Sequence, residues 1–496
     1  MNITVNRHSS VTIKEQVRLE IAQRIQSGLL EEGHLLPSVR QLSSQLHISL
    51  VTAHQVYQGL EKDGLIDAIR GKGTFVKKRK ITPIQNTQPP HPALPPFQWQ
   101  LSIPDYLPRA SYWSHSAVRL PPEILDLSTA SIHHSLLPLD LLQDSIKHAL
   151  SKHTRSLGSY SPYQGDREFL EAISHYLFTQ SGLTLEPHRL IITNGTQQGL
   201  DLFARTFLGP GDVIAMETPC FSSAIDTFRL SRATIQPIPL DHDGMRIDIL
   251  EELASHGRLK AIYTVPTFQN PTGIIMSYRR RKEILEFAEA NNILILEDDP
   301  HRELFSAGNG LKKLPPPLKS LDTTGRVIYL KGFSKFLFPG LRLGIMAADG
   351  SIYNRLLAIK SIADLGSPLW LQKALLLLFT SPHLTMYIKS LNQTLAQRRE
   401  LVATMLSREL NPVIYYPQLA GGMHLWLTLP PDLAADDLIP AAHQRGIHFL
   451  PGSIFYPAEP ELNHLRICWT NLSNEDLPKA LSLLCDLLNR ALTAKP

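Results

Sequence analysis

The stretch RVIYLKGFSKFLFPGLRLG, residues 326–344, decides the fold of the larger part of this chain. Its apolar run predicts a strand, and the polar residues that follow include a lysine, Lys335, and an arginine, Arg342, seven residues later. Similar apolar runs come earlier in the chain: LIIT (190–193), DVIAM (212–216), KAIYTV (260–265) and ILILED (293–298). Amphipathic stretches separate these runs. Together they predict an α/β fold, a mostly parallel sheet with helices on both faces.

The chain of 496 residues is too long for one hydrophobic core, so at least two domains are expected. Residues 10–79 have helical periodicity and end in a basic run, whereas residues 123–492 carry the strand and helix pattern. Residues 80–122 lie between them and include QPPHPALPPF (88–97), whose prolines favour an extended, semi-rigid linker.

The composition limits the class of protein. A hydrophobic share of 43% and a charged share of 19% are typical of a folded globular protein, and a net charge of +4 does not by itself indicate nucleic-acid binding. The three cysteines, Cys220, Cys468 and Cys485, are too few and too far apart for a disulfide framework or a metal site. The first residues lack the apolar run of a signal peptide, and no apolar run is long enough to span a membrane. We therefore expect a cytoplasmic protein without a bound metal.

The N-terminal region has the pattern of a small DNA-binding domain. Helices are expected at residues 13–27, after Ser38 as N-cap, and at 50–64, with a tight turn between the second and third. Residues 65–76 predict two short strands around a basic, glycine-rich tip that can approach phosphates closely.

The motifs G-x-L-x-x-G-x-x-LPS-x-R-x-L, S-x-x-T, L-x-x-x-G-L-I and R-x-G-x-GTFV, in this order over about the first 76 residues, resemble the winged helix-turn-helix of GntR regulators. The resemblance implies binding to double-stranded DNA. The residues it places at the DNA are Arg40, Ser49, Thr52, His54, Arg70, Lys72 and Gly73. The family usually has arginine after the serine of the recognition helix, where this chain has Leu50.

The C-terminal region offers the groups that a cofactor forming imines requires. Lys335 supplies an amine, and Arg342 can reach a phosphate. Asp298 or Asp299, at the end of a predicted strand, can neutralise a protonated ring nitrogen. In ITNGTQQGLDLF (192–203) a strand turns at Gly195 into a helix whose N-terminus favours an anion.

Over residues 123–492 the chain resembles the fold-type I, class I/II aminotransferases, with a smaller C-terminal α+β subdomain. The strings that carry the resemblance are YSPYQG (160–165), NGTQQG (194–199), GPGD (209–212), PTFQNPTG (266–273), ILEDDP (295–300), GFSK (332–335), PGLRLG (339–344), GGMHLWL (421–427) and HLRICWTN (464–471).

This resemblance implies pyridoxal 5′-phosphate as the cofactor and assigns a role to each matching residue. Lys335 would form the Schiff base with the cofactor, Asp298 would keep its pyridine nitrogen protonated, and Asn270 would bind its phenolic oxygen. Gly195, Thr196, Gln197, Ser334 and Arg342 would bind its phosphate. Phe221 would stack on the ring, Tyr160 would reach the site of the partner subunit, and Arg466 would bind the carboxylate of an amino-acid ligand.

Two positions depart from the aminotransferase pattern. His301 stands near the position of a usual tyrosine that contacts the phenolic oxygen, and Gly332 replaces a hydroxyl-bearing residue three positions before the lysine. His301 could substitute for the tyrosine. We expect cofactor binding to survive both changes and transamination to be slow or absent.

The two regions together resemble the MocR subfamily of GntR regulators, typically homodimers. This implies a regulator that responds to pyridoxal phosphate or to an amine or amino-acid ligand. An active aminotransferase with a DNA-binding head is the alternative, and a degenerate domain used only for dimerisation is disfavoured by Lys335, Asp298, Asn270 and Arg466. The sequence does not reveal the target genes, the sign of regulation or the effector.

Overall fold

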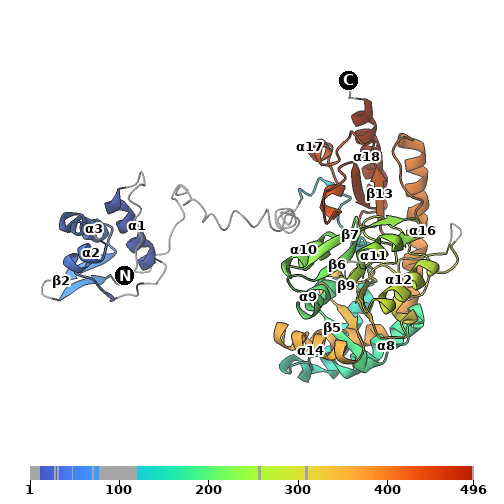
Figure 1. The fold of residues 1–496 in the computed structure, drawn as a ribbon, viewed down its shortest axis with the longest axis horizontal. Coiled ribbons are helices and arrows are strands. Elements are labelled where there is room, and N and C mark those ends of the chain that lie inside the picture. The colour runs from blue at the N-terminus through green and yellow to red at the C-terminus, as the bar shows by residue number, and fades with distance from the viewer. Residues whose placement is uncertain are drawn as a thin grey trace. The chain divides into compact units, whose positions relative to one another are not determined.

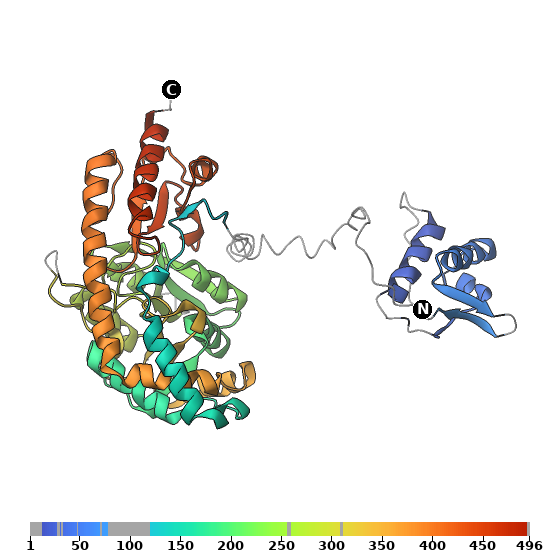
Figure 2. The same ribbon diagram turned by 180° about the vertical axis from the view of Figure 1, so that it is seen from behind.

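The computed structural model of the chain describes residues 12–26, 30, 33–46, 48–69, 72–77, 120–254, 259–307 and 311–493. The chain divides into two compact units, Met1–Pro95 and Pro96–Pro496, which are considered separately (Figures 1 and 2). The predicted linker, 80–122, lies outside the described residues except for its last three positions.

The first unit is a helix-turn-helix with a small antiparallel sheet, as the sequence predicts. Its elements are α1 (Ile13–Gln26), β1 (Leu35–Leu36), α2 (Val39–Leu46), α3 (Leu50–Lys62), β2 (Ile66–Ile69) and β3 (Gly73–Val76), with strand order β1-β3-β2. Apolar residues of α1, α2 and α3 form the core of the unit, among them Ile21, Leu42 and Leu60, which are fully buried.

Polar side chains begin the two helices of the motif. At the start of α2 the Gln41 N–H donates to Ser38 Oγ (3.3 Å) and the Ser38 N–H donates to Gln41 Oε1 (2.8 Å), a reciprocal capping box. Ser49 caps α3 by accepting the Thr52 N–H at 3.0 Å. The cap places the first turn of α3 at a fixed point after the tight turn, as a recognition helix requires.

The second unit is built on a mostly parallel sheet, as expected, with strand order β5-β12-β11-β10-β9-β6-β7-β8. Strand β12 runs antiparallel to both of its neighbours, and β8 antiparallel to β7. The strands are β5 (Leu190–Thr193), β6 (Val213–Thr218), β7 (Thr234–Asp241), β8 (Gly244–Met245), β9 (Leu259–Thr264), β10 (Leu294–Asp298), β11 (Val327–Gly332) and β12 (Gly344–Ala347).

Helices cover both faces of this sheet (Figure 1). Along β11, Ile328 and Leu330 pack with α9, α10 and α14, whereas Tyr329 packs on the opposite face in the core that includes α8 and α15. The alternation explains why the run VIYL is apolar throughout. The helices of this part are α7 (Leu139–Lys152), α8 (Arg167–Ser181), α9 (Gly195–Phe207), α10 (Ser222–Leu230), α11 (Ile247–Ala254), α12 (Tyr278–Ala290), α13 (Leu318–Leu321), α14 (Gly350–Ala363) and α15 (Leu369–Thr380).

A smaller subdomain follows, with an antiparallel sheet in the order β13-β16-β15 and a two-stranded parallel sheet of β14 and β4. Its strands are β4 (Leu125–Asp126), β13 (His424–Thr428), β14 (Ile447–His448), β15 (Leu450–Pro451) and β16 (His464–Cys468), and its helices are α16 (Pro382–Glu409), α17 (Ile439–Gln444) and α18 (Asp476–Thr493). Because β4 comes directly after the predicted linker, the chain enters this unit through the smaller subdomain and then continues into α7 (Figure 2).

Three strands of the large sheet were not expected, namely β7, β12 and the two-residue β8. Strand β7 contains Pro237 and Pro239, which argue against a strand because proline lacks an N–H to donate; β7 lies near the margin of the sheet, where that loss is tolerated. Strand β12 has only four residues. Within the described ranges, no helix is long and apolar enough to cross a membrane, and no cluster of side chains could hold a metal ion.

Candidate functional site

A cavity of about 540 Å³ lies where β11 ends and α9 and α10 begin. Six of the residues predicted from the sequence line it, namely Thr196, Gln197, Phe221, Ser334, Lys335 and Arg342. They come from segments up to 146 positions apart (342 − 196), and the sheet brings those segments to one edge. Ligands of open α/β sheets bind at this edge, beyond the carboxyl ends of the strands.

One part of the cavity is suited to an anion. Helix α9 begins at Gly195, with φ +74°, and a Cβ built there would lie 2.6 Å from Nη2 of Arg342. The guanidinium therefore occupies the space beside the first turn of α9, where free backbone N–H groups and the helix dipole favour negative charge. Glycine is needed at this position because any side chain would displace the arginine.

Asp298 lies at the end of β10 and is 2% exposed. Its Oδ2 accepts a hydrogen bond from the Tyr263 hydroxyl at 3.0 Å, and its Oδ1 has no partner among the described residues. Burial raises the pKa of Asp298 to about 7. Asp299, the other acid considered from the sequence, instead forms an ion pair with Arg302. Of the two acids, Asp298 is the one that forms no ion pair within the described residues. Its carboxylate is therefore the one available to bind a ring nitrogen.

Lys335 follows β11 by three residues, and its Nζ donates to the carbonyl oxygen of Ala130 at 2.8 Å. Burial, together with the positive charges of Arg466 and Arg342, lowers the pKa of the Lys335 ammonium to about 8. An amine with a lowered pKa is unprotonated more often near neutral pH, which suits a nucleophile.

Arg466 lies in β16 and is 4% exposed. Its Nη1 donates to Oδ1 of Asn270 at 3.2 Å, and its Nη2 donates to the carbonyl oxygen of Ser128. Its guanidinium carbon lies 5.1 Å from the centre of the Phe455 ring. Because both Nη atoms of this buried guanidinium are held, the group has a fixed orientation in which it can donate hydrogen bonds to a carboxylate.

The remaining predicted residues are placed as follows. His301 is buried and lies near enough to Lys335 for the lysine charge to lower the histidine pKa, but it does not line the cavity. Tyr160 is 91% exposed and also does not line the cavity. One chain therefore brings together the predicted lysine, acid, asparagine and arginine, whereas Tyr160 lies outside their group.

Several residues of the site were not predicted. Asp226 and Thr227 line the cavity from α10, and the Thr227 Oγ1 accepts a hydrogen bond from Gln197 Nε2 at 2.7 Å. Tyr263 donates a hydrogen bond to Asp298 from the neighbouring strand β9. In the sequence it is only one more residue of the apolar run KAIYTV. The carbonyls of Ser128 and Ala130 had no sequence signal, since every residue has a carbonyl.

The predicted DNA-contacting residues that the structure describes come from α2, from α3 and from the tip between β2 and β3. Arg40 is exposed on α2, and Ser49, Thr52 and His54 lie at or near the start of α3. Lys72 and Gly73 lie at the tip between β2 and β3, and both are exposed. Arg70 lies outside the described residues.

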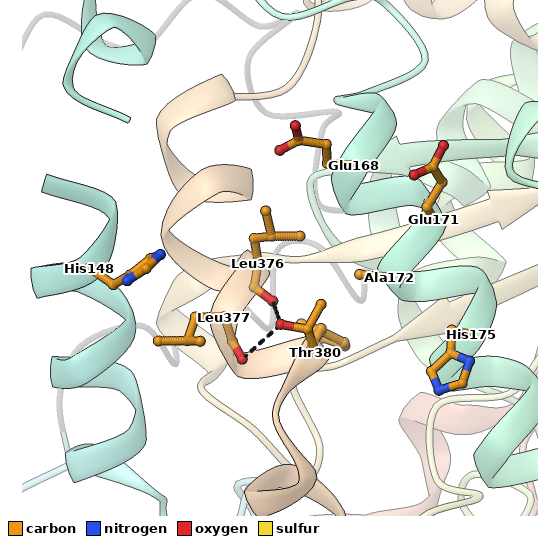
Figure 3. Close-up of a pocket in the computed structure, with 9 residues that line it drawn as sticks. His148, Glu168, Glu171, Ala172, His175, Leu376, Leu377 and Thr380 are labelled. Carbon is orange, nitrogen blue, oxygen red and sulfur yellow. Dashed lines mark hydrogen bonds between the residues drawn. The ribbon is translucent and has the colours of Figure 1, made fainter. Parts of the chain in front are cut away.

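A second cavity, of about 500 Å³, lies among α7, α8 and α15 (Figure 3). Figure 3 shows His148 on α7 across the groove from Glu168, Glu171 and His175 on α8. Glu168 is bound there by Lys373 (2.7 Å), and the residues that line this cavity do not include any of the predicted site.

The comparisons with known proteins match both units. Residues 131–484 match the family of class I and II aminotransferases, and residues 13–76 match the GntR family of bacterial regulatory proteins. Aromatic-amino-acid aminotransferase 1 of Thermococcus litoralis is 30% identical and covers 71% of this chain and 84% of its own. The HTH-type transcriptional regulator YdfD of Bacillus subtilis is 28% identical over 93% of both chains. The crystal structure of α-aminoadipate aminotransferase LysN of Thermus thermophilus, complexed with N-(5′-phosphopyridoxyl)-L-leucine, has a TM-score of 0.73 at 27% identity and covers 80% of this chain and all of that one.

The residues that line the cavity, together with Asp298 nearby, fit pyridoxal phosphate, the cofactor expected from the sequence. Arg342 and the start of α9 offer a phosphate cradle that a Cβ at Gly195 would fill, and Asp298 offers an unpartnered buried oxygen. Lys335 lines the same cavity as Arg342, and its charge is close enough to Asp298 to act on the pKa of that acid.

The pH dependence of cofactor uptake tests the assignment of Lys335. Only the unprotonated amine of Lys335 would be able to bind the aldehyde of the cofactor, so uptake should rise about tenfold per pH unit below the lysine pKa and level off near pH 8. The measurement is the initial rate at which visible absorbance appears after pyridoxal phosphate is added to cofactor-free protein. Lys335→Ala should remain colourless, and Lys260→Ala, a surface control, should behave as the wild type. A wild-type protein that stays colourless would contradict the assignment.

Proposed function

We propose that this chain, which belongs to the class I and II aminotransferase family and carries a GntR-type DNA-binding domain, is a transcription regulator that responds to an amine or amino acid. This combination of domains is that of the MocR subfamily. One observation carries the ligand response. Lys335, expected to hold the cofactor, and Arg466, expected to bind the ligand carboxylate, both donate hydrogen bonds to the segment that joins the predicted linker.

In this proposal the cofactor is pyridoxal phosphate, which when bound supplies an aldehyde for the ligand amine and a ring that draws electrons from it. Arg342 and the first turn of α9 bind the phosphate. Asp298 holds a proton on the ring nitrogen, and Tyr263 orients that carboxylate. Asn270 is fixed by the hydrogen bond from Nη1 of Arg466, and the same guanidinium binds the ligand carboxylate.

The segment at residues 125–131, here called the strap, lies along the smaller subdomain. Its backbone pairs with β14 through Leu125 and Leu127, whose N–H groups donate to Gly446 (2.7 Å) and His448 (2.8 Å). The Leu127 carbonyl accepts the Cys468 N–H at 2.6 Å, and the Ser131 carbonyl accepts the Thr470 hydroxyl at 2.7 Å. The strap is thus held by backbone bonds along its length, and between them by the two cations of the site.

Cofactor and ligand would compete with the strap for these two side chains. A ligand carboxylate on Arg466 would compete with the Ser128 carbonyl for Nη2, and the cofactor held by Lys335 would replace the bond of that lysine to Ala130. An amine that displaces Lys335 from the cofactor would release the lysine again, so the bonds of the strap would depend on what occupies the site. The strap is joined in sequence to the predicted linker, which leads to the DNA-binding unit. Occupancy of the site would therefore change how firmly the end of the linker is held.

We also propose that the protein is located in the cytoplasm, where its operator DNA is.

We further propose a homodimer. Leu157, Tyr160, Ile362 and Leu365 are large apolar side chains that are more than half exposed. Two segments carry them, and these meet where a Cβ at Gly366 would lie 3.0 Å from the Ser161 carbonyl. The neighbouring Asp364 accepts a hydrogen bond from Gln198 in the first turn of α9, so this apolar face adjoins the phosphate cradle. A second copy covering it would bring its own Tyr160 to the cavity, and two DNA-binding units suit paired half-sites.

The dimer is tested by sedimentation of the purified chain. The wild type should have twice the mass of one chain, and Ile362→Glu should lower the association constant and the affinity for pyridoxal phosphate together. Met386→Glu, at another exposed apolar position, on α16, should change neither. A monomeric wild type at micromolar concentration would contradict the proposal.

The DNA-binding residues are tested by gel shifts on the intergenic DNA upstream of the gene. Arg40→Ala and Lys72→Ala should weaken binding, and each should lower the slope of log K against log salt by about one unit if the side chain binds one phosphate. Lys62→Ala, at the far end of α3, is the matched control. The visible absorbance of all three variants should equal that of the wild type. If neither substitution changed the affinity for DNA, the assignment of Arg40 and Lys72 as DNA-binding residues would be wrong.

The link between ligand and DNA is tested by titrating amino acids against the visible absorbance, with and without operator fragment. We expect the ligand affinity to differ by roughly five- to 150-fold, the size of a typical allosteric coupling. Thr470→Val removes one bond of the strap and should reduce this ratio, whereas Thr380→Val on the exposed side of α15 should not. Identical curves with and without DNA would show the sites to be uncoupled. Steady turnover of an amino acid with a keto acid at ordinary enzyme rates would favour the alternative, an active aminotransferase carrying a DNA-binding head.

A further inference from the structure

Two histidines near Lys335 are buried without hydrogen-bond partners. His301 is 1% exposed and His424 3% exposed, and their rings meet edge to face with centroids 5.1 Å apart and planes at 88°. None of their four ring nitrogens has a partner among the described residues. Native structures seldom leave buried polar atoms unsatisfied, because the lost hydration is not replaced. A pair of such rings therefore requires an explanation.

The residues around His301 are, by contrast, bound to one another. Asp299 pairs with Arg302, and Glu303 pairs with Lys331 and accepts the Tyr176 hydroxyl at 2.8 Å. These contacts anchor the turn that follows β10 on both sides of His301. The imidazole is thus held in place by its neighbours while its own nitrogens remain unused.

The close approach of the two rings depends on the start of β13. The Gly422 N–H donates to the Leu304 carbonyl at 2.9 Å, which joins the turn after β10 to the residues just before His424. A Cβ at Gly421 would lie 2.8 Å from that carbonyl and 2.6 Å from Cζ of Phe268. Glycine at this position is what allows the two segments to meet.

The pair lies beside both cations of the proposed ligand site. In the register of β13 and β16, His424 is opposite Cys468 and Trp426 is opposite Arg466, so His424 and Arg466 are diagonal neighbours on one face. Burial lowers the pKa of His301 to about 3; Lys335, Lys331 and Arg466 contribute to this, and Asp299 opposes it. Burial also lowers the pKa of His424, with contributions from Arg466, His301 and Lys335. Both rings are neutral at physiological pH, and each has one N–H to donate.

We propose that His301 and His424 form an oxygen-binding site, in which the neutral imidazoles donate to an oxygen atom brought between Lys335 and Arg466. The inference rests on the proposed function, because that function places a cofactor and an amino acid between these cations. Two sources share the required chemistry. The oxygen belongs either to the cofactor, as the phenolic oxygen that His301 is expected to contact, or to the side chain of the amino-acid ligand. His424 is the new member of the site in both cases.

The first arm of the test measures the dissociation constant of pyridoxal phosphate alone, from the visible absorbance. His301→Phe and His424→Phe keep an aromatic ring but remove the donors. If the oxygen is that of the cofactor, each should weaken binding roughly threefold to tenfold, the size expected when one hydrogen bond is removed. His301→Tyr and His424→Asn retain a donor and should restore part of the affinity. His175→Phe, on the exposed side of α8, controls for loss of a histidine elsewhere (Figure 3).

The second arm measures binding of L-threonine against L-valine and of L-asparagine against L-leucine to the protein with its cofactor. If the oxygen is that of the ligand, the wild type should prefer the polar member of each pair. Both phenylalanine variants should lose that preference while the affinity for pyridoxal phosphate is kept.

The proposal is overturned if the phenylalanine variants, folded as judged by an unchanged melting transition, alter neither the cofactor affinity nor the ligand preference. It is equally overturned if His424→Asn and His301→Tyr lose as much as the phenylalanine variants, because the rings would then serve only for packing. Neither arm contains DNA, so failure of ligand-to-operator coupling leaves both results interpretable.

Discussion

The parallel pairing of β10 with β11 is the constraint on which the site depends. In its register Asp298 lies opposite Leu330, so the acid and the segment that carries Lys335 leave the sheet at the same edge. Parallel strands end together, whereas an antiparallel pair would place these two groups at opposite edges. Because β12 returns antiparallel beside β11, Arg342 comes back to the start of α9. The relative positions of the acid, the amine and the phosphate cradle therefore follow from the order and direction of the strands.

A second constraint acts at the other end of the site. The strap enters the domain through backbone pairing with β14 and β16, which fixes its carbonyls over the two cations. In this chain the same segment follows the predicted linker, so in the proposed function the position of a few carbonyl groups would affect both ligand binding and DNA binding. The path in sequence between the ligand site and the linker is short, so the proposal does not require transmission through the sheet.

The fold and much of the site could be predicted because their signals are local. Apolar runs indicated β5, β6, β9, β10 and β11, and the motifs that carry the resemblance to the aminotransferases pointed to Lys335, Arg342 and Asn270 as residues of one site. The choice between Asp298 and Asp299 was left open by the residues themselves, since neighbouring acids look alike until their partners are known. The assigned roles of the site residues, and the domain boundaries, remain predictions.

The unpredicted features depend on contacts between segments far apart in sequence. Tyr263 reads as an apolar strand residue, and only the neighbouring strand gives its hydroxyl a partner. Backbone acceptors such as Ser128 and Ala130 have no side-chain signature. The pairing of His424 with His301 depends on the fold, which brings the turn after β10 against the start of β13.

A ligand can shift a protein between two arrangements only through its difference in affinity for them. In the proposed function, the bond from Arg466 to the strap would provide such a difference, because a ligand carboxylate bound to Arg466 would replace it. Retention of the aminotransferase residues is thus consistent with regulation: the groups that would bind a substrate are the same groups that hold the strap.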